Sequence, residues 1–283
     1  MLSAVTICLV PEAARGPFVF HESLERGCQM AATLGFDAVE VFPNGPEDPE
    51  LDQLPDLLSR YRLKLAAIGT GAGWLKHQWS LSSSDPEIRR KAVGFVEGLI
   101  DRAGPLGAPA IVGSMQGRSQ PPASRESCLE RLADALGHLS RHATAAHQTT
   151  LLYEPLNRYE TDLFCQLTPA RRWLEEEGLD GVRLLADLFH MNLEEHHPAQ
   201  AILSNGAAIG HVHLADSNRQ AMGRGHTQQK AILEALRRIG YSGFLSAEVF
   251  PIPNAVVAAK QTLVAVDQWR GWLGAAGGTP AAF

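Results

Sequence analysis

Short apolar runs alternate with amphipathic runs along the whole 283-residue chain, and this alternation is the strongest constraint on its fold. The apolar runs have the length and composition of buried strands. The segments between them have helical periodicity, and several begin with Pro or end with Gly. The predicted strands are residues 5–10, 38–42, 63–68, 110–112, 149–153, 182–186, 209–214 and 243–249. The predicted helices are residues 22–34, 51–61, 85–103, 124–147, 168–177, 198–205, 227–239 and 254–272.

Eight strand–helix pairs in 283 residues predict a (β/α)8 TIM barrel, which typically needs about 250 residues. A doubly wound sheet is the competing fold. It uses fewer strands, and the GxGxxG turn that binds dinucleotides does not follow the first predicted strand. No linker-like segment divides the chain. We therefore expect one TIM-barrel domain over residues 1–283, with a flexible tail from about residue 274.

Composition excludes several classes of protein. No apolar run is long enough for a transmembrane helix, and a net charge of −6 argues against a nucleic-acid partner. The N-terminus lacks the basic region of a signal peptide, and the four cysteines are far apart with no CxxC pair. These features predict a cytoplasmic enzyme that acts on a small molecule, without membrane or nucleic-acid partners.

The last four predicted strands end in residues that can bind a metal. The fifth lies in LLYEPLNRYE and ends at Glu154, the sixth is followed by Asp187, the seventh carries a histidine, and the eighth ends at Glu248. In a TIM barrel these strand ends meet at one face. Three carboxylates in an apolar barrel mouth repel one another, and a divalent cation relieves that repulsion. Oxygen and imidazole ligands favour Mn²⁺, Mg²⁺ or Co²⁺.

Two histidines compete for the place on the seventh strand. His211 and His213 are two residues apart, so both point to the same side of the sheet and spacing does not choose between them. His213 lies nearer the carboxyl end and is the better ligand by position. His211 then becomes a hydrogen-bonded core residue, and Glu40 at the end of the second strand is a weaker candidate for the site. Five other histidines carry no cluster in the sequence: His21, His77, His138, His142 and His147.

The two glutamates predict a reaction. Glu154 and Glu248 come from different sides of the barrel mouth, so a substrate held between them faces one carboxylate on each side. One carboxylate removes a proton from a carbon beside a carbonyl, and the metal stabilises the resulting enediolate. The other carboxylate returns a proton to the opposite face, which inverts the stereocentre.

Four motifs carry a family resemblance: EPLNRYETDLF, DLFHMNLEE, GHVHLADSNR followed by GRGH, and AEVF. They resemble the sugar phosphate isomerase/epimerase superfamily, the xylose-isomerase-like TIM barrels. They are most similar to its ketose 3-epimerase branch, which includes D-tagatose and D-psicose 3-epimerases and keto-sugar-acid epimerases. The motifs occur in the order of that family between about residues 37 and 250.

The resemblance implies one divalent ion, usually Mn²⁺, in a protein that forms dimers or tetramers. The implied metal ligands are Glu154, Asp187, His213 and Glu248, with Glu154 and Glu248 as the catalytic acid/base pair. The implied substrate-binding residues are Glu160, His190, Arg219 and Phe250. Arg219 follows His213 at the spacing of the family, which again favours His213 as the ligand.

The sequence departs from the family at two places. GSMQGRSQ lacks the aromatic residue that tagatose and psicose enzymes carry after the fourth strand, and Met222 stands where family members often have Pro. The GSMQGRSQ segment is more similar to the branch that acts on keto-sugar acids or on unassigned substrates. Arg118 and His226 are then candidates to bind a carboxylate or phosphate of the substrate.

We therefore predict a divalent-metal-dependent epimerase of a keto-sugar or keto-sugar acid that works through a metal-stabilised cis-enediolate. An aldose–ketose isomerase similar to hydroxypyruvate isomerase and an inosose dehydratase are alternatives that would use the same residues. An apurinic endonuclease-like nuclease would need more metal-binding histidines and a basic groove. A non-catalytic sugar-binding barrel would not need a pair of glutamates.

Overall fold

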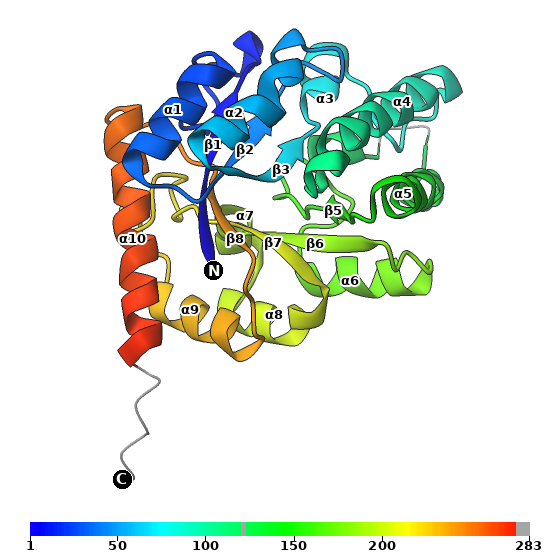
Figure 1. Ribbon diagram of the computed structural model, residues 1–283. Helices are drawn as coiled ribbons and strands as arrows, with labels where there is room; N and C mark the ends of the chain where they lie inside the picture. The colour runs from blue at the N-terminus through cyan, green and yellow to red at the C-terminus, as the bar shows by residue number, and fades with distance from the viewer. Residues whose placement is uncertain (120–122, 276–283) are drawn as a thin grey trace.

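The computed structural model describes residues 1–119 and 123–275 and shows a closed barrel of parallel strands surrounded by helices (Figure 1). Each strand pairs with the next along the chain, and β8 pairs with β1. The strands are β1 (Leu2–Cys8), β2 (Ala38–Phe42), β3 (Lys64–Gly69), β4 (Ala110–Val112), β5 (Leu151–Tyr153), β6 (Val182–Asp187), β7 (Ile209–His213) and β8 (Phe244–Ala247). The prediction of a TIM barrel is confirmed.

The helices lie around this barrel. They are α1 (Leu24–Leu34), α2 (Leu54–Tyr61), α3 (Ala72–His77), α4 (Pro86–Ala103), α5 (Arg125–His147), α6 (Leu167–Glu176), α7 (Leu188–Glu194), α8 (Pro198–Asn205), α9 (Gln229–Arg238) and α10 (Ala255–Ala275). Side-chain caps begin several of them: Ser23 caps α1, Asp85 caps α4 and Ser124 caps α5. The final helix continues to Ala275, and residues 276–283 of the expected tail lie outside the described residues.

Helix α3 is an element that the sequence pattern did not predict. It lies in the glycine-rich segment after β3, where local propensity favours a loop. A β-carbon on Gly73 would lie 2.6 Å from the sulfur of Met115. Glycine therefore lets this short helix pack directly against the segment that follows β4. A contact between distant residues, rather than helix propensity, accounts for α3.

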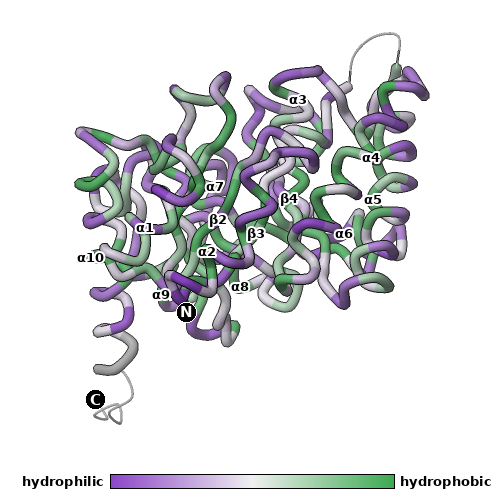
Figure 2. Tube along the Cα trace, turned by 45° about the horizontal axis from the view of Figure 1, so that its top comes forward, coloured by the Kyte–Doolittle hydropathy of each residue, from purple (hydrophilic) through white to green (hydrophobic). Residues whose placement is uncertain are grey.

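The interior of the barrel is a packed core. Four fully or nearly fully buried side chains, one from each of the strands β3 to β6, form a cluster of their own: Ala67, Ile111, Leu152 and Leu185. They fill the barrel as the side-chain layers of this fold usually do. Figure 2 shows hydrophilic residues along the outer side of α4 and α5 and hydrophobic residues along β2. Among the described residues, no helix combines the length and the apolar composition needed to cross a bilayer.

A polar junction ties the first strand to the last helix. Asp37 accepts hydrogen bonds from the backbone and hydroxyl of Ser3, each at 2.8 Å, and from the guanidinium of Arg270 at 2.6 Å. Partial burial alone would raise the pKa of Asp37, but the bonds from Ser3 and Arg270 outweigh it and lower that pKa. The junction therefore keeps Asp37 ionised between the first strand, β1, and the last helix, α10.

We predict that Asp37→Ala lowers the free energy of unfolding by about 1–3 kcal/mol, because a part-buried acceptor with three donors is lost. Asp267→Ala is the control, since Asp267 also pairs with Arg270 but is largely exposed. It should change stability by less than about 0.5 kcal/mol. Urea denaturation measures both, and equal effects of the two variants would contradict the assignment.

The same junction predicts a dependence on pH. Because the pKa of Asp37 is depressed in the folded state, its contribution is present above the unfolded value of about 3.9. It is lost as the pH falls through the folded pKa. The stability difference between the wild type and Asp37→Ala should therefore be constant from pH 7 to about pH 5 and narrow below about pH 4.

Candidate metal centre and active-site cavity

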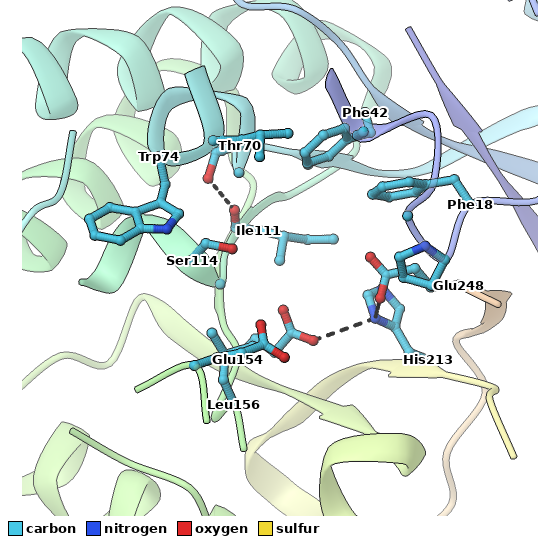
Figure 3. A pocket seen from close by; sticks show the side chains of 18 of the residues that line it. Phe18, Phe42, Thr70, Trp74, Ile111, Ser114, Glu154, Leu156, His213 and Glu248 are labelled. Atoms are coloured by element: carbon cyan, nitrogen blue, oxygen red, sulfur yellow. Dashed lines mark hydrogen bonds and ion pairs between the residues drawn. The ribbon is translucent and has the colours of Figure 1, made fainter. Parts of the chain in front are cut away.

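The carboxyl ends of four neighbouring strands bring the four predicted ligands together. Glu154 follows β5, Asp187 ends β6, His213 ends β7 and Glu248 follows β8. One ligand atom from each lies within 4.8 Å of the ligand atoms of the other three. Figure 3 shows Glu154, His213 and Glu248 pointing into one cavity. Residues far apart in sequence thus form one group because each stands at the same end of its strand.

The cluster fits a divalent cation. His213 Nδ1 lies 3.3 Å from Asp187 Oδ2, 3.4 Å from Glu248 Oε2 and 3.6 Å from Glu154 Oε1. Within the described part of the chain, the buried Glu154 Oε1 has no hydrogen-bond partner. A buried acceptor without a donor is costly unless a cation meets it. The donor set of three carboxylates and one imidazole is typical of sites for Mn²⁺, Mg²⁺ or Co²⁺.

The charges around the cluster also favour a cation. Four carboxylates, none with a side chain more than 15% exposed, lie in the cluster or against its histidine: Glu40, Glu154, Asp187 and Glu248. Arg219 pairs with both Asp187 and Glu248. Burial raises the pKa of Glu154, whereas nearby Arg219 and His190 hold the pKa of Asp187 well below its usual range despite burial. The site therefore carries excess negative charge that a bound divalent ion would balance.

Glu40 sets the orientation of His213. Its Oε1 lies 3.1 Å from His213 Nε2, and its Oε2 lies 2.8 Å from His211 Nε2. Burial opposes its ionisation, but His213 and His211 outweigh burial and depress the pKa of Glu40. With Nε2 held by this carboxylate, His213 presents Nδ1 to the cluster. His211 supports Glu40 from the other side, as expected for a core histidine, and Glu40 has a more direct part in the site than its sequence position indicates.

The two oxygens of the Asp187 carboxylate make different contacts. Its Oδ1 caps α7 by accepting from the backbone N–H groups of Phe189 at 2.7 Å and His190 at 3.2 Å. Its Oδ2 points to the cluster, where it meets His213 and Arg219. One oxygen therefore begins the helix and the other remains available as a ligand.

The position of Glu154 depends on the segment after β4. The amide of Gln116 donates to the carbonyl of Glu154 at 2.9 Å and to that of Gly113 at 3.0 Å. A β-carbon on Gly113 would lie 2.5 Å from Glu154 Oε2, so only glycine leaves room for the carboxylate. Neither role is visible in the sequence, because GSMQG contains no charged residue and reads as an ordinary loop.

His190 and Arg219 form a pair of donors in the cavity. The backbone N–H of Asn157 donates to His190 Nδ1 at 3.2 Å and its side-chain amide lies 2.9 Å from the same nitrogen, so Nε2 is the nitrogen that His190 presents as a donor. Nη1 of Arg219 lies 3.3 Å from that Nε2 and 3.3 Å from Asp187 Oδ2, so the two donors lie side by side at the edge of the cluster. Glu160 joins the group by accepting from Asn157 at 2.8 Å. A substrate oxygen would satisfy both donors.

Asp216 organises the loop that carries Arg219. It is fully buried and accepts from the backbone N–H groups of Ser217, Gly223 and Thr227 at 2.7–3.0 Å. Arg219 itself has a φ of +58°, a strained conformation for a residue other than glycine. The turn that Asp216 closes therefore maintains a backbone that directs the guanidinium into the cavity.

The cavity has a volume of about 500 Å³. Its polar end contains the cluster, and its opposite wall is largely apolar, with Phe18, Phe42 and Trp74 (Figure 3). Phe18 and Phe42 stack with ring centroids 4.6 Å apart. Glu160, His190, Arg219 and Phe250 line the cavity, as the resemblance implies.

Two other predicted substrate contacts lie elsewhere. Arg118 is exposed and is not among the residues that line this cavity, and the exposed His226 lines a separate depression beside His196 and His197. The structure therefore does not bring either side chain together with the cluster. Sequence order alone does not reveal this separation, because both residues follow strands whose carboxyl ends lie at the barrel mouth.

Comparisons with known proteins agree with this geometry. The family described as "xylose isomerase-like TIM barrel" matches residues 28–265. The chain belongs to this family. Its relatives include the 3-dehydro-D-guloside 4-epimerase of Escherichia coli K12, which is 33% identical over 239 residues, 81% of this chain and 88% of the relative. The L-ribulose 3-epimerase of Methylomonas sp. DH-1 is 30% identical over 78% of this chain and 76% of its own.

A solved structure of an L-ribulose 3-epimerase has the same fold. It superimposes with a TM-score of 0.80 at 24% identity and covers 99% of both chains. The family match and the 33% identical relative confirm the family membership expected from the four motifs, and this structure confirms the fold.

We predict that Glu40→Gln weakens Mn²⁺ binding by about 10–100-fold, because the carboxylate that orients His213 loses its charge. Isothermal titration calorimetry of the metal-free protein measures the effect. Glu12→Gln is the matched control: Glu12 also lines the cavity but is exposed at its rim. The control should bind Mn²⁺ as the wild type does. Equal affinity of Glu40→Gln and the wild type would rule out this role for Glu40.

Proposed function

We propose that the protein is a divalent-metal-dependent epimerase of a keto sugar, with Glu154 and Glu248 as its acid/base pair. The observation that carries the proposal is the position of these two carboxylates. They come from β5 and β8, which are separated by two strands of the barrel, and both face the same cavity. The epimerase names of the relatives bear out the prediction of an isomerase that acts on carbohydrates.

Each residue has a defined task in the proposed reaction. His190 and Arg219 donate to oxygens at the carbonyl end of the substrate, and Glu160 accepts from a hydroxyl. One glutamate removes the proton from the carbon beside the carbonyl, and the other delivers a proton to the opposite face. Burial raises the pKa of Glu154, which suits a carboxyl group that accepts and returns a proton. A divalent ion held by Glu154, Asp187, His213 and Glu248 would stabilise negative charge on the substrate oxygens.

The charges of the cavity favour a neutral substrate. Five lining residues carry carboxylates: Glu12, Glu40, Glu154, Glu160 and Glu248. Arg219 is the only lysine or arginine among the lining residues, and it is already paired with Asp187 and Glu248. A substrate carboxylate or phosphate that does not reach the metal would meet these carboxylates, with no unpaired lysine or arginine among the lining residues to balance its charge. Of the two substrate classes predicted from the sequence, a keto sugar or a keto-sugar acid, we therefore propose the neutral keto sugar, free or as a keto glycoside.

The two-base mechanism predicts the effect of removing either carboxylate. Glu248→Gln and Glu154→Gln should each lower turnover by about 10²–10⁴-fold or more. Incubation with neutral ketoses and Mn²⁺ in D₂O, followed by NMR, measures both product formation and deuterium at the exchanged carbon. Turnover of Glu248→Gln near the wild-type rate would contradict the mechanism. Deuterium without inversion would instead indicate an isomerase.

Removal of the metal gives an independent test. Treatment with EDTA followed by desalting should abolish turnover, and Mn²⁺ should restore it, because the substrate oxygens lose their electrostatic stabilisation. The control is the wild type desalted without chelator. Full activity in a preparation shown by elemental analysis to be metal-free would contradict metal dependence.

A further inference from the structure

A second group of metal-binding side chains lies on the outside of the barrel, where α4 and α5 pack side by side (Figure 1). It consists of Asp101, near the end of α4, and His142 and His147, in the last turns of α5. The structure corrects the expectation that these histidines belong to no cluster. Residues 101 and 142 are far apart in the sequence, and only the packing of the two helices brings them together.

The distances within this group suit metal coordination. The Nε2 atoms of His142 and His147 lie 2.7 and 2.8 Å from the same oxygen, Oδ1 of Asp101. The three ligand atoms all lie within 4.8 Å of one another. In the tetrahedral geometry usual for Zn²⁺, ligand atoms bound at about 2.0–2.1 Å are about 3.3–3.4 Å apart, so side-chain shifts of about 0.6 Å from the observed hydrogen-bonded spacing would accommodate an ion. Glu97 Oε1 lies 3.5 Å from the other ring nitrogen of His142, where it can orient the imidazole.

A positive charge would stabilise the carboxylates of Glu97 and Asp101. In residues 1–119 and 123–275, Glu97 and Asp101 form ion pairs with histidines and with no lysine or arginine. Asp101 lies in the last turn of α4, and His147 is the last residue of α5. The carboxyl end of a helix carries partial negative charge, so an aspartate there is unfavourable without a cation.

His147 is held in place by a close backbone contact. A β-carbon on Gly104, just after α4, would collide with the His147 ring. The side chain of His147 is only 16% exposed, compared with 52% for Asp101. The ring of His147 therefore packs against the backbone at Gly104, which fixes its position. The side of the group formed by Asp101 is open to solvent.

We propose that Asp101, His142 and His147 form a second metal site, for a borderline divalent ion such as Zn²⁺. Two imidazoles and one carboxylate favour Zn²⁺, Co²⁺ or Ni²⁺ over the harder Mn²⁺ and Mg²⁺. His147 precedes β5 and Glu154 follows it, so this site lies at the opposite end of the barrel from the active-site cavity. The bound ion joins α4 to α5 and stabilises the fold without a part in catalysis.

Zinc content and thermal stability test this proposal. The wild type should retain one more Zn²⁺ per chain after desalting than His142→Gln or Asp101→Asn, and should bind that ion with a dissociation constant below about 10 μM. In Asp101→Asn, the side-chain oxygen can still accept hydrogen bonds from the rings of His142 and His147, so the fold is retained. A loss of zinc in this variant therefore reports the loss of the carboxylate ligand. Saturating Zn²⁺ should raise the Tm of the wild type by about 5 °C relative to these variants.

His138→Gln is the matched control. His138 lies on the same face of α5 and contacts Glu97 at 3.6 Å, but it is not one of the three ligands. It should keep the wild-type zinc content, and all variants should keep the wild-type turnover with Mn²⁺. Equal zinc content in the wild type and His142→Gln, or binding weaker than about 10 μM, would overturn the second site and leave the proposed epimerase reaction unaffected.

Discussion

The burial of several carboxylates at the mouth of a barrel is the constraint on which the rest of this structure depends. Parallel strands that end at one face bring Glu154, Asp187 and Glu248 within a few ångströms of one another. Like charges at this distance and depth destabilise the fold unless cations or donors meet them. The neighbouring residues supply these cations and donors. Arg219 pairs with Asp187 and Glu248, and His213 Nδ1 lies 3.3–3.6 Å from an oxygen of each of the three carboxylates.

Much of the remaining structure holds these few groups in place. Glu40 reaches across the barrel interior to fix His213, while Asp187 uses one oxygen to begin α7 and keeps the other for the cluster. The loop closed by Asp216 maintains Arg219 in a backbone conformation with positive φ. Gly113 leaves space for Glu154. Catalytic groups need this kind of support, because displacement of about 1 Å can cost a large part of the rate.

The proposed active site and the proposed second metal site lie at opposite ends of the barrel. The carboxyl end of the strands combines a negative cluster with an aromatic wall, an arrangement suited to a neutral sugar that has polar edges and an apolar face. The opposite end contains the contact between the last turns of α4 and α5, where Asp101 meets two histidines. An ion at that end would stabilise the barrel without reaching the substrate, in keeping with the separation of stability and catalysis in this fold.

The sequence by itself determined the barrel and the composition of its central cluster. Strand and helix periods are local properties of the chain, and the order of the motifs shows which strand carries each ligand. Tertiary structure alone decided the rest. Spacing could not separate His213 from His211, because both face inward; Glu40, on a distant strand, decides which nitrogen faces the cluster. Likewise, the paths of the loops placed Arg118 and His226 outside the cavity, and helix packing brought Asp101 to His142 and His147. Contacts between residues far apart in the chain leave no local pattern, so only the folded molecule reveals them.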